Sequence, residues 1–381
     1  MKSLKWRQVN AWRLSQHCLS PRLKRQDLVK AVTRTGGIQA QVMSAAELAL
    51  WARVDGLSPR DVQSALWQER TLVKTWAMRG TLHLIAASDL PLYVAARSMH
   101  ADRNWLKYFT YYGITPAQYE AFLAAVPQVL GSEPMTREQL AAALARHIGA
   151  PELRRLLLSS SWGSLWKPSA LRGDLCFGPN QGRNVTFVRP GQWIGKWQSV
   201  EPHLALQEIA RRYLRAYGPA TPEDFARWWE LRIVPARKLF QSIEDELEEV
   251  DVEGWRALAL RTTLEPRQRL ETPGAVRLLP LFDAYTLGLG RDLEPLLPRA
   301  YKRQVFRPQG WISAVVLVDG YMKGVWEYKI RRSPTIVKIN MFSSPGASVR
   351  RGIEAEAERL GAFLNTKVAL EYEDHSSTNS R

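Results

Sequence analysis

Hydrophobic and polar positions along the chain follow two rhythms, one with the period of a helix and one with the period of a strand. Helical segments with capping residues recur, and each group of helices is followed by alternating residues around a glycine. This succession appears about three times before residue 265. Helices followed by a two-stranded hairpin are typical of the winged helix, a relative of the helix-turn-helix.

The first unit shows the pattern most fully. Its helical segments are predicted at 21–36, 41–54 and 59–70, and Ser58 caps the third of them. Two strands follow, with a break between them at Gly80.

Hairpins close the second and third units. Residues 174–188 are predicted to form two strands around a polar tip, and Arg183 lies near that tip. The third unit ends in a hairpin around Gly254. From about residue 275 the rhythm changes, and Asp319-Gly320 between two alternating segments predicts another hairpin in a small β-rich domain with one helix.

These patterns predict an α+β fold in which tandem winged-helix units precede a small β-barrel-like C-terminal domain. In chain order we expect three winged-helix units, the β-rich domain and a frayed tail at residues 1–110, 111–195, 196–265, 266–372 and 373–381.

The charge of the chain indicates what kind of partner it binds. The 381 residues carry a formal net charge of +16, and the sequence pI is about 10.0. The first 35 residues contain nine lysines and arginines against one acid. Excess positive charge concerns partners rather than fold, and nucleic acid is the usual polyanion. Charge therefore favours a nucleic acid as the partner, and together with the winged-helix pattern we expect double-stranded DNA.

The compartment follows from what the sequence lacks. Cys18 and Cys176 are far apart and share no metal-ligand spacing. The first residues have no apolar core of a secretory signal, and no apolar run is long enough to span a bilayer. A reduced, cytoplasmic and nucleoid-associated chain is expected. No zipper-like dimerisation helix is visible, which favours a monomer.

The sequence lacks the motifs that usually bind a metal or a cofactor. The six histidines are scattered, and no HExxH, CxxC or EF-hand spacing occurs. There is no phosphate-binding GxxxxGK[ST], no GxGxxG after a strand and no GxSxG elbow. We expect no cofactor and no metal, which leaves a cofactor-free enzyme or a binding protein.

The segment "GGIQAQVM" at 36–43 raises a chemical question. In a helix Gln39 and Gln41 would point about 200° apart, whereas in an extended segment residues i and i+2 point the same way. Gly36 and Gly37 end the preceding helix, so an extended connector is predicted. There the two amides can converge on one water without ionising.

A water that is only oriented can displace an excellent leaving group. Hydrolysis of an N-glycosidic bond passes through a cationic sugar, as glycoside hydrolysis does, and a purine alkylated at N7 or N3 departs easily because it is already cationic. Amide oxygens facing the sugar can stabilise its charge. The motif alone is weak, because glutamines at the start of a helix usually cap it or face water.

Several segments in order resemble one family, the bacterial winged-helix DNA glycosylases of the AlkZ and YcaQ type, which repair interstrand crosslinks. The resemblance covers about residues 5–370. It is carried by "GGIQAQ", "TWAMRGTLHLI", "LRGDLCFGPNQGRNVTFV", "YLRAYGPATPEDFARWW", "LLPLFDAYTLG" and "VLVDGYMKGVW".

The resemblance implies tandem winged helices, a DNA-holding cleft, excision of N-alkylated purines and no metal. A family motif of Gln-x-Gln or Gln-x-Asp carries the chemistry, and it falls here on Gln39 and Gln41. The amide at position 41 resembles the AlkZ branch. We infer either a narrower set of well-activated lesions or a slower reaction than a carboxylate at this position would give.

Candidate DNA-binding residues come from several elements. Arg79 and His83 lie in a segment that matches a family motif, where they can touch phosphate or base or pair locally. Arg183 at the hairpin tip can contact phosphate or stay solvated. Arg237 and Lys238 lie on the last helix of the third unit, but seven acids in the next ten-residue stretch disfavour conventional docking there.

Asp283 and Tyr285 also match a family motif. Asp283 either acts as a catalytic carboxylate or fixes a turn, and the second interpretation is favoured.

The leading hypothesis is a monofunctional DNA glycosylase that hydrolyses the N-glycosidic bond of cationic N-alkylated purines of the N7-alkylguanine type. Crosslinks are a possible substrate and an abasic site is the product. No motif nominates a Schiff-base lysine for a lyase step. The alternative is a non-catalytic winged-helix regulator, which predicts a specific operator, dimerisation and no base release.

Overall fold

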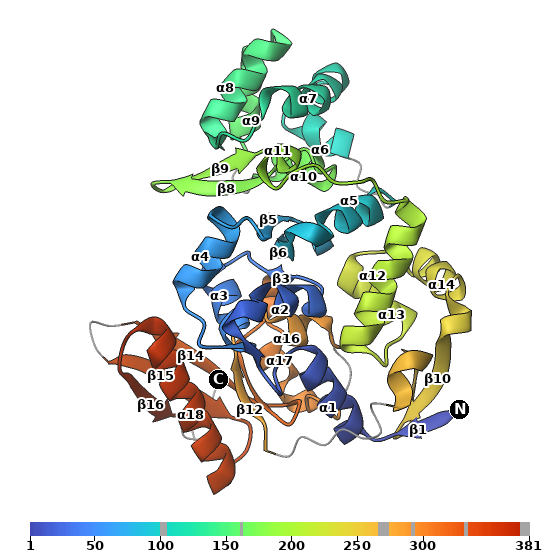
Figure 1. The fold of residues 1–381 in the computed structure, drawn as a ribbon, viewed down its shortest axis with the longest axis vertical. Coiled ribbons are helices and arrows are strands. Elements are labelled where there is room, and N and C mark those ends of the chain that lie inside the picture. Colours follow the sequence, from blue (N-terminus) through green and yellow to red (C-terminus); the bar gives the residue numbers. More distant parts are fainter. Residues whose placement is uncertain (100–104, 161–162, 266–273, 291–293, 331–333, 374–381) are drawn as a thin grey trace. The chain divides into compact units, whose positions relative to one another are not determined.

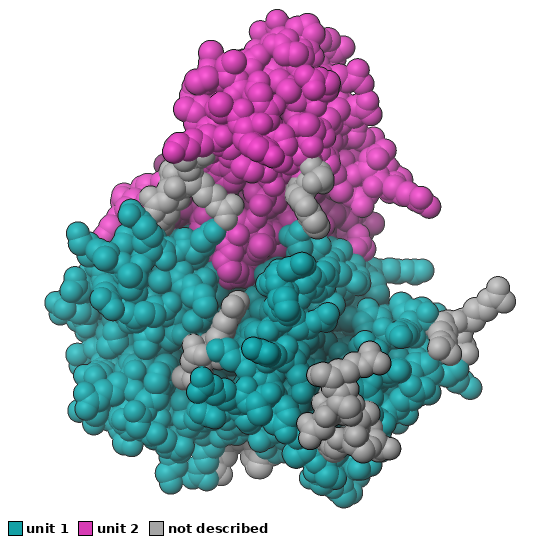
Figure 2. Space-filling model, turned by 180° about the vertical axis from the view of Figure 1, so that it is seen from behind, with its two compact units in different colours: residues 1–61, 210–381 teal, residues 62–209 magenta. Residues whose placement is uncertain are grey.

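The computed structural model describes residues 1–99, 105–160, 163–265, 274–290, 294–330 and 334–373. The chain divides into two compact units, which Figure 2 colours separately. Unit 1 comprises residues 1–61 and 210–381, and unit 2 comprises residues 62–209.

The N-terminal part of unit 1 is helical (Figure 1). It contains α1 (Trp6–Gln16), α2 (Leu28–Thr35), the two-residue strand β3 (Ile38–Gln39) and α3 (Met43–Trp51), and α4 (Pro59–Trp67) begins at its end. The helix predicted at 21–36 begins only at Leu28, so the prediction is wrong for residues 21–27. Strand β2 (Leu23–Lys24) occupies that stretch, because it pairs in parallel with β4 (Val54–Asp55).

The region predicted as the third unit has helices followed by a hairpin. The elements are α12 (Pro202–Tyr217), α13 (Pro222–Trp229), α14 (Ile233–Gln241), β10 (Leu247–Val252) and β11 (Trp255–Leu260). Thr221 caps α13 as expected, since its hydroxyl accepts from the backbone N–H of Asp224. The hairpin gains a third strand that the sequence did not suggest, because β1 (Lys2–Leu4) pairs in parallel with β10.

The C-terminal part of unit 1 is a five-stranded sheet. Its order is β12 (Val276–Leu279), β13 (Val315–Val318), β14 (Tyr321–Lys329), β15 (Thr335–Met341) and β16 (Val368–Tyr372). Neighbours are antiparallel except β15 and β16, which α18 (Ala347–Leu364) connects. Within the described ranges this sheet is open, with β12 and β16 at its edges. The hairpin predicted at Asp319-Gly320 is confirmed.

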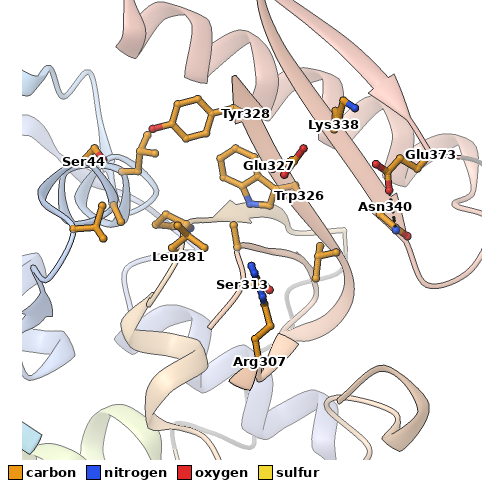
Figure 3. A pocket seen from close by; sticks show the side chains of 16 residues that line it. Ser44, Leu281, Arg307, Ser313, Trp326, Glu327, Tyr328, Lys338, Asn340 and Glu373 are labelled. Atoms are coloured by element: carbon orange, nitrogen blue, oxygen red, sulfur yellow. Dashed lines mark hydrogen bonds between the residues drawn. The ribbon is translucent and has the colours of Figure 1, made fainter. Parts of the chain in front are cut away.

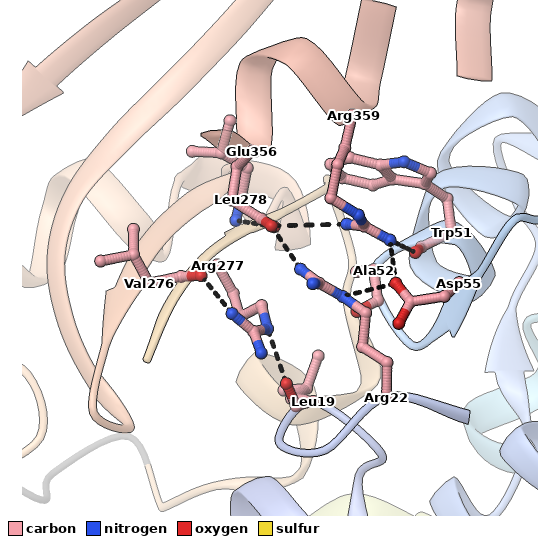
Figure 4. A network of polar contacts seen from close by, with 10 residues as sticks. All are labelled: Leu19, Arg22, Trp51, Ala52, Asp55, Val276, Arg277, Leu278, Glu356 and Arg359. Carbon is pink, nitrogen blue, oxygen red and sulfur yellow. Dashed lines mark hydrogen bonds and ion pairs between the residues drawn. The ribbon is translucent and has the colours of Figure 1, made fainter. Parts of the chain in front are cut away.

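A polar network ties the N-terminal helices of unit 1 to this sheet (Figure 4). Glu356 of α18 accepts from Arg22 and from Arg359, and Arg359 also pairs with Asp55 at 3.0 Å. The Arg277 side chain on β12 donates to the carbonyl oxygen of Leu19 at 2.6 Å. Arg359 also donates to the carbonyl oxygen of Trp51, the last residue of α3, at 3.3 Å, so residues far apart in sequence hold α3 and the sheet in one unit.

Unit 2 contains the second predicted set of helices and a hairpin. Its strands are β5 (Leu72–Trp76), β6 (Leu82–Ala86), β7 (Met135–Thr136), β8 (Cys176–Gln181) and β9 (Asn184–Val188). Its helices are α5 (Leu90–Ser98), α6 (Trp105–Tyr111), α7 (Pro116–Val129), α8 (Arg137–Ile148), α9 (Glu152–Leu158), α10 (Lys167–Leu171) and α11 (Pro190–Trp193). Aromatic side chains including Phe122, Trp166 and Phe187 fill its main core. The break at Gly80 and the hairpin with Arg183 at its tip are confirmed.

None of the helices in the described ranges is long and apolar enough to cross a membrane. The predicted division into three winged-helix units and a β-rich domain stays a prediction.

Candidate functional site

The Gln-x-Gln segment starts where α2 is forced to end. Gly36 has φ 71°, a left-handed conformation that residues with a Cβ rarely adopt. The backbone N–H of Gly36 donates to Thr33 at 3.2 Å, and that of Gly37 donates to Val32 at 2.9 Å. These bonds satisfy two of the last carbonyls of the helix and end it at Gly36.

The residues that follow are buried as far as Ala40, and the exposed part of the segment begins at Gln41. Ile38 and Ala40 are 1% and 0% exposed, Gln39 is 8% exposed, and Gln41 is exposed. Gln39 lies in β3, and Val42, which precedes α3, is also extended. Gln41 itself lies in a bend before α3. The predicted break between the two helices is confirmed and Gln39 is extended, whereas a common side for the Gln39 and Gln41 side chains stays a prediction.

The hydroxyl of Tyr217 supports the base of this segment. It donates to the carbonyl oxygen of Thr35, the last residue of α2, at 2.8 Å. The buried ring of His17 packs edge-on against Tyr217, with ring centres 4.7 Å apart. The carbonyl oxygen of Tyr217 accepts from the Arg13 guanidinium at 2.9 Å. The start of the Gln-x-Gln segment is thus bonded to a buried part of unit 1.

A fully buried ion pair lies elsewhere in the same unit. Two nitrogens of Arg53 donate to the two carboxylate oxygens of Asp283 at 2.7 and 2.8 Å. Asp283 also accepts from the backbone N–H of Tyr285 at 2.9 Å and so caps α16 (Ala284–Gly288). Burial alone lowers the pKa of Arg53, but the Asp283 carboxylate outweighs this and raises it. These contacts support the interpretation of Asp283 as a turn-fixing residue.

Sequence reasoning missed Arg13, His17 and Arg53. Burial, followed by the charges of Arg53 and Arg13, holds the pKa of His17 well below its usual range, so the ring is neutral. Their partners lie up to about 230 residues away, and no local spacing connects them. Only the unusual number of basic residues near the N-terminus pointed to this region.

Arg79 and His83 form a local pair in unit 2. The Nδ1–H of His83 donates to the carbonyl oxygen of Thr81 at 2.9 Å, and its Nε2 lies 3.5 Å from Arg79. His83 is 1% exposed. Burial and the nearby Arg79 charge lower the pKa of His83 to about 3. This burial favours a role in holding the turn at Arg79 over direct contact with DNA.

The other basic candidates are exposed. Arg183 lies at the tip of the β8–β9 hairpin, and Arg237 and Lys238 lie on α14. Arg237 pairs with Glu223 at 2.8 Å on the surface. Gln39 and Gln41 share unit 1 with Arg237 and Lys238, whereas Arg79, His83 and Arg183 belong to unit 2. No single unit contains all seven candidates.

Comparison with known proteins gives the class of this chain. Residues 32–363 match the family model described as DNA glycosylase AlkZ-like. The chain is 39% identical over 332 residues to an interstrand DNA cross-link repair glycosylase from Streptomyces sahachiroi, covering 84% of this chain and 87% of the relative.

The fold agrees with this match. The solved structure of the Streptomyces sahachiroi DNA glycosylase AlkZ superposes with a TM-score of 0.87 at 35% identity, covering 98% of this chain and all of that one. The protein belongs to the AlkZ-like DNA glycosylase family. The predicted resemblance, the predicted α+β class and the prediction of a DNA glycosylase are confirmed.

Proposed function

We propose that the chain is a monofunctional DNA glycosylase for cationic N-alkylated purines, with N7-alkylguanine as the type substrate and an abasic site as the product. One observation carries this proposal. Ile38 and Ala40 are fully buried, Gln39 is 8% exposed in a two-residue strand, and Gln41 is exposed. The motif that resembles the catalytic one therefore lies outside the helices, and Gln41 reaches the surface.

In the proposed reaction the two amide oxygens accept hydrogen bonds from one water and aim its oxygen at C1′ of the damaged nucleotide. The bond between C1′ and N9 breaks, and its electron pair neutralises the cationic purine as it leaves. The water oxygen bonds to C1′ and gives up a proton to solvent. The amides need no ionisation, so the chemistry depends on the charge already on the base.

We propose that the helix-and-hairpin sets act as winged helices on duplex DNA and that the enzyme works as a monomer. Arg79, Arg183, Arg237 and Lys238 are the proposed phosphate contacts, with His83 holding Arg79. The name of the relative from Streptomyces sahachiroi supports a further activity, the unhooking of interstrand crosslinks.

The test is single-turnover release of N7-methylguanine from a methylated duplex by wild type and by Gln41→Ala. We expect the substitution to slow release by at least about a hundredfold, because a misplaced water loses that much. Fluorescence anisotropy should show unchanged DNA binding. Gln68→Ala replaces an exposed glutamine on the surface and should keep the wild-type rate.

Two results would overturn the proposal. One is equal release by Gln41→Ala and wild type. The other is no release by the wild type from either a methylated or a nitrogen-mustard-crosslinked duplex while the protein binds both.

A further inference from the structure

Two pockets, one in each unit, differ in the charge of their walls. The unit 1 pocket has about 430 Å³ and lies between the start of α3, at Val42, and β14 (Figure 3). Cations and acids line it together, namely Arg307, Lys338, Glu327 and Glu373. The unit 2 pocket has about 480 Å³, and the described residues that line it include two arginines and no acid. Walls of mixed charge compensate themselves, whereas two guanidinium groups favour an anion.

The rest of the unit 2 pocket is apolar and aromatic. Val94 of α5 and Leu171 of α10 line it, together with Trp105, Tyr119 and Trp197. Its volume lies within the range of about 300–1,000 Å³ that small-molecule sites occupy. Walls of this kind hold an extrahelical nucleobase by stacking in enzymes that take a base out of the duplex. The pocket therefore suits a flat aromatic ring.

The two arginines of this pocket, Arg97 and Arg172, differ in exposure. Arg97 is 9% exposed. The Arg172 side chain is 55% exposed and pairs through Nε with Asp174 at 3.2 Å. A phosphate group can therefore reach Arg172 from solvent, and guanidinium groups bind phosphate through paired hydrogen bonds. An aromatic ring beside a phosphate is the chemistry of a nucleotide.

A row of aromatic rings continues from the pocket along α6. Trp105 contacts Tyr108 edge-on with ring centres 6.1 Å apart, and Tyr108 contacts Tyr112 at 5.2 Å. Spacings of three and four residues place these rings on one face of the helix. Tyr111, which is 83% exposed, contacts Tyr112 at 5.3 Å and extends the row. A free small molecule needs only the pocket, whereas successive bases of one strand can stack on successive rings.

We infer that unit 2 binds an unpaired DNA strand. One nucleotide places its base in the pocket beside Trp105 and its phosphate at Arg172, and the next bases stack along α6. The inference goes beyond the proposed function, because the bound bases are undamaged and are not excised. No bond is made or broken at this site.

The test measures fluorescence anisotropy with three labelled probes. They are a single strand of about 12 nucleotides, the same strand with abasic spacers in place of its bases, and a blunt duplex. The variants are Trp105→Ala, Tyr111→Ala and Arg172→Glu. Tyr111→Phe keeps the ring and is the matched control for Tyr111→Ala. Arg155→Glu makes the same charge change as Arg172→Glu at an exposed arginine on α9 of the same unit.

We expect the wild type to bind the strand with bases more tightly than the abasic strand. Both alanine variants should weaken single-strand binding by at least about fivefold and leave duplex binding unchanged, because each removes a stacking surface. Arg172→Glu should weaken single-strand binding more than Arg155→Glu does, and Tyr111→Phe should keep the wild-type affinity.

The inference is overturned if Tyr111→Ala and Arg172→Glu bind the single strand as wild type does. It is also overturned if the alanine variants lose as much affinity for the duplex or for the abasic strand. None of these measurements depends on base release, so a failure of the proposed glycosylase function is a separate outcome. Thermal melting of each variant confirms the fold.

Discussion

Gln41 and Asp283 lie in the same unit and in motifs that resemble the same family, but their surroundings are opposite. Asp283 is fully buried, and its carboxylate is taken by Arg53 and by the backbone N–H of Tyr285. Gln41 is exposed and directly precedes Val42, which lines a pocket. A carboxylate whose lone pairs are used internally stabilises the fold, whereas a neutral amide at the surface can orient a substrate.

The largest effect is expected at the buried carboxylate of Asp283. Asp283→Ala leaves the Arg53 charge buried without a partner and should lower the free energy of unfolding by about 3–5 kcal/mol in urea titrations. Asp55→Ala is the matched control, because its carboxylate is exposed and its ion pairs should contribute about 1 kcal/mol or less. Unchanged stability with lost base release would instead make Asp283 catalytic.

A buried titratable group in unit 2, His83, extends the comparison, because its burial makes stability depend on pH. The pKa of buried His83 is about 3, below its unfolded value near 6.5, so the unfolded state binds the proton first. The stabilising contribution is present above pH 6.5 and is lost as the pH falls toward 3, at about 1.4 kcal/mol per pKa unit. His83→Gln should therefore flatten the fall in unfolding midpoint between pH 6.5 and 4. A slope equal to that of wild type would contradict the assignment.

A smaller effect is expected at Tyr217. Its substitution tests whether this residue positions the two glutamines or only stabilises the fold. Tyr217→Phe removes the hydrogen bond to Thr35 and should cost about 1 kcal/mol of stability. It should also slow base release without weakening DNA binding, because the Gln-x-Gln segment starts there. Tyr213→Phe is matched, since that hydroxyl donates to the carbonyl oxygen of Gly288 at 3.1 Å. Equal rates in the two variants would reduce Tyr217 to a purely structural role.

The smallest effect concerns one exposed cation. Arg183→Ala should weaken DNA binding and reduce the slope of log affinity against log salt by about one unit, if Arg183 contacts one phosphate. Base release at saturating enzyme should not change. Arg154→Ala in the same unit is the control, because Arg154 is exposed but pairs with Glu138 at 2.6 Å. Identical slopes for both variants would leave Arg183 outside the DNA interface.

Local signals predicted the parts of the fold that depend on near neighbours. Gly36 ends α2, Thr221 caps α13, and Asp319-Gly320 joins two strands, each for reasons contained in a few adjacent residues. The end of α2 before the Gln-x-Gln segment also followed from the glycines there. The position of this segment between two helices could therefore be predicted from sequence.

Long-range pairing could not be predicted in this way. The parallel pairing of β1 with β10 joins residues about 250 positions apart, and the Arg53–Asp283 pair spans 230 positions. The short β2–β4 pairing replaced the start of a predicted helix, because backbone bonds to a distant strand outweighed local helix propensity. The sheet side of the pocket at the start of α3 also depends on such contacts, so no local pattern predicted it.

The central claim is that Gln39 and Gln41 hold one water together. A double-mutant cycle tests it most directly, with single-turnover release of N7-methylguanine measured for wild type, Gln39→Ala, Gln41→Ala and the double variant. Groups that act on one water are strongly non-additive, so the double variant should be about as slow as either single variant. Losses that multiply would contradict the shared water, and release at the wild-type rate in all three variants would remove both amides from the chemistry.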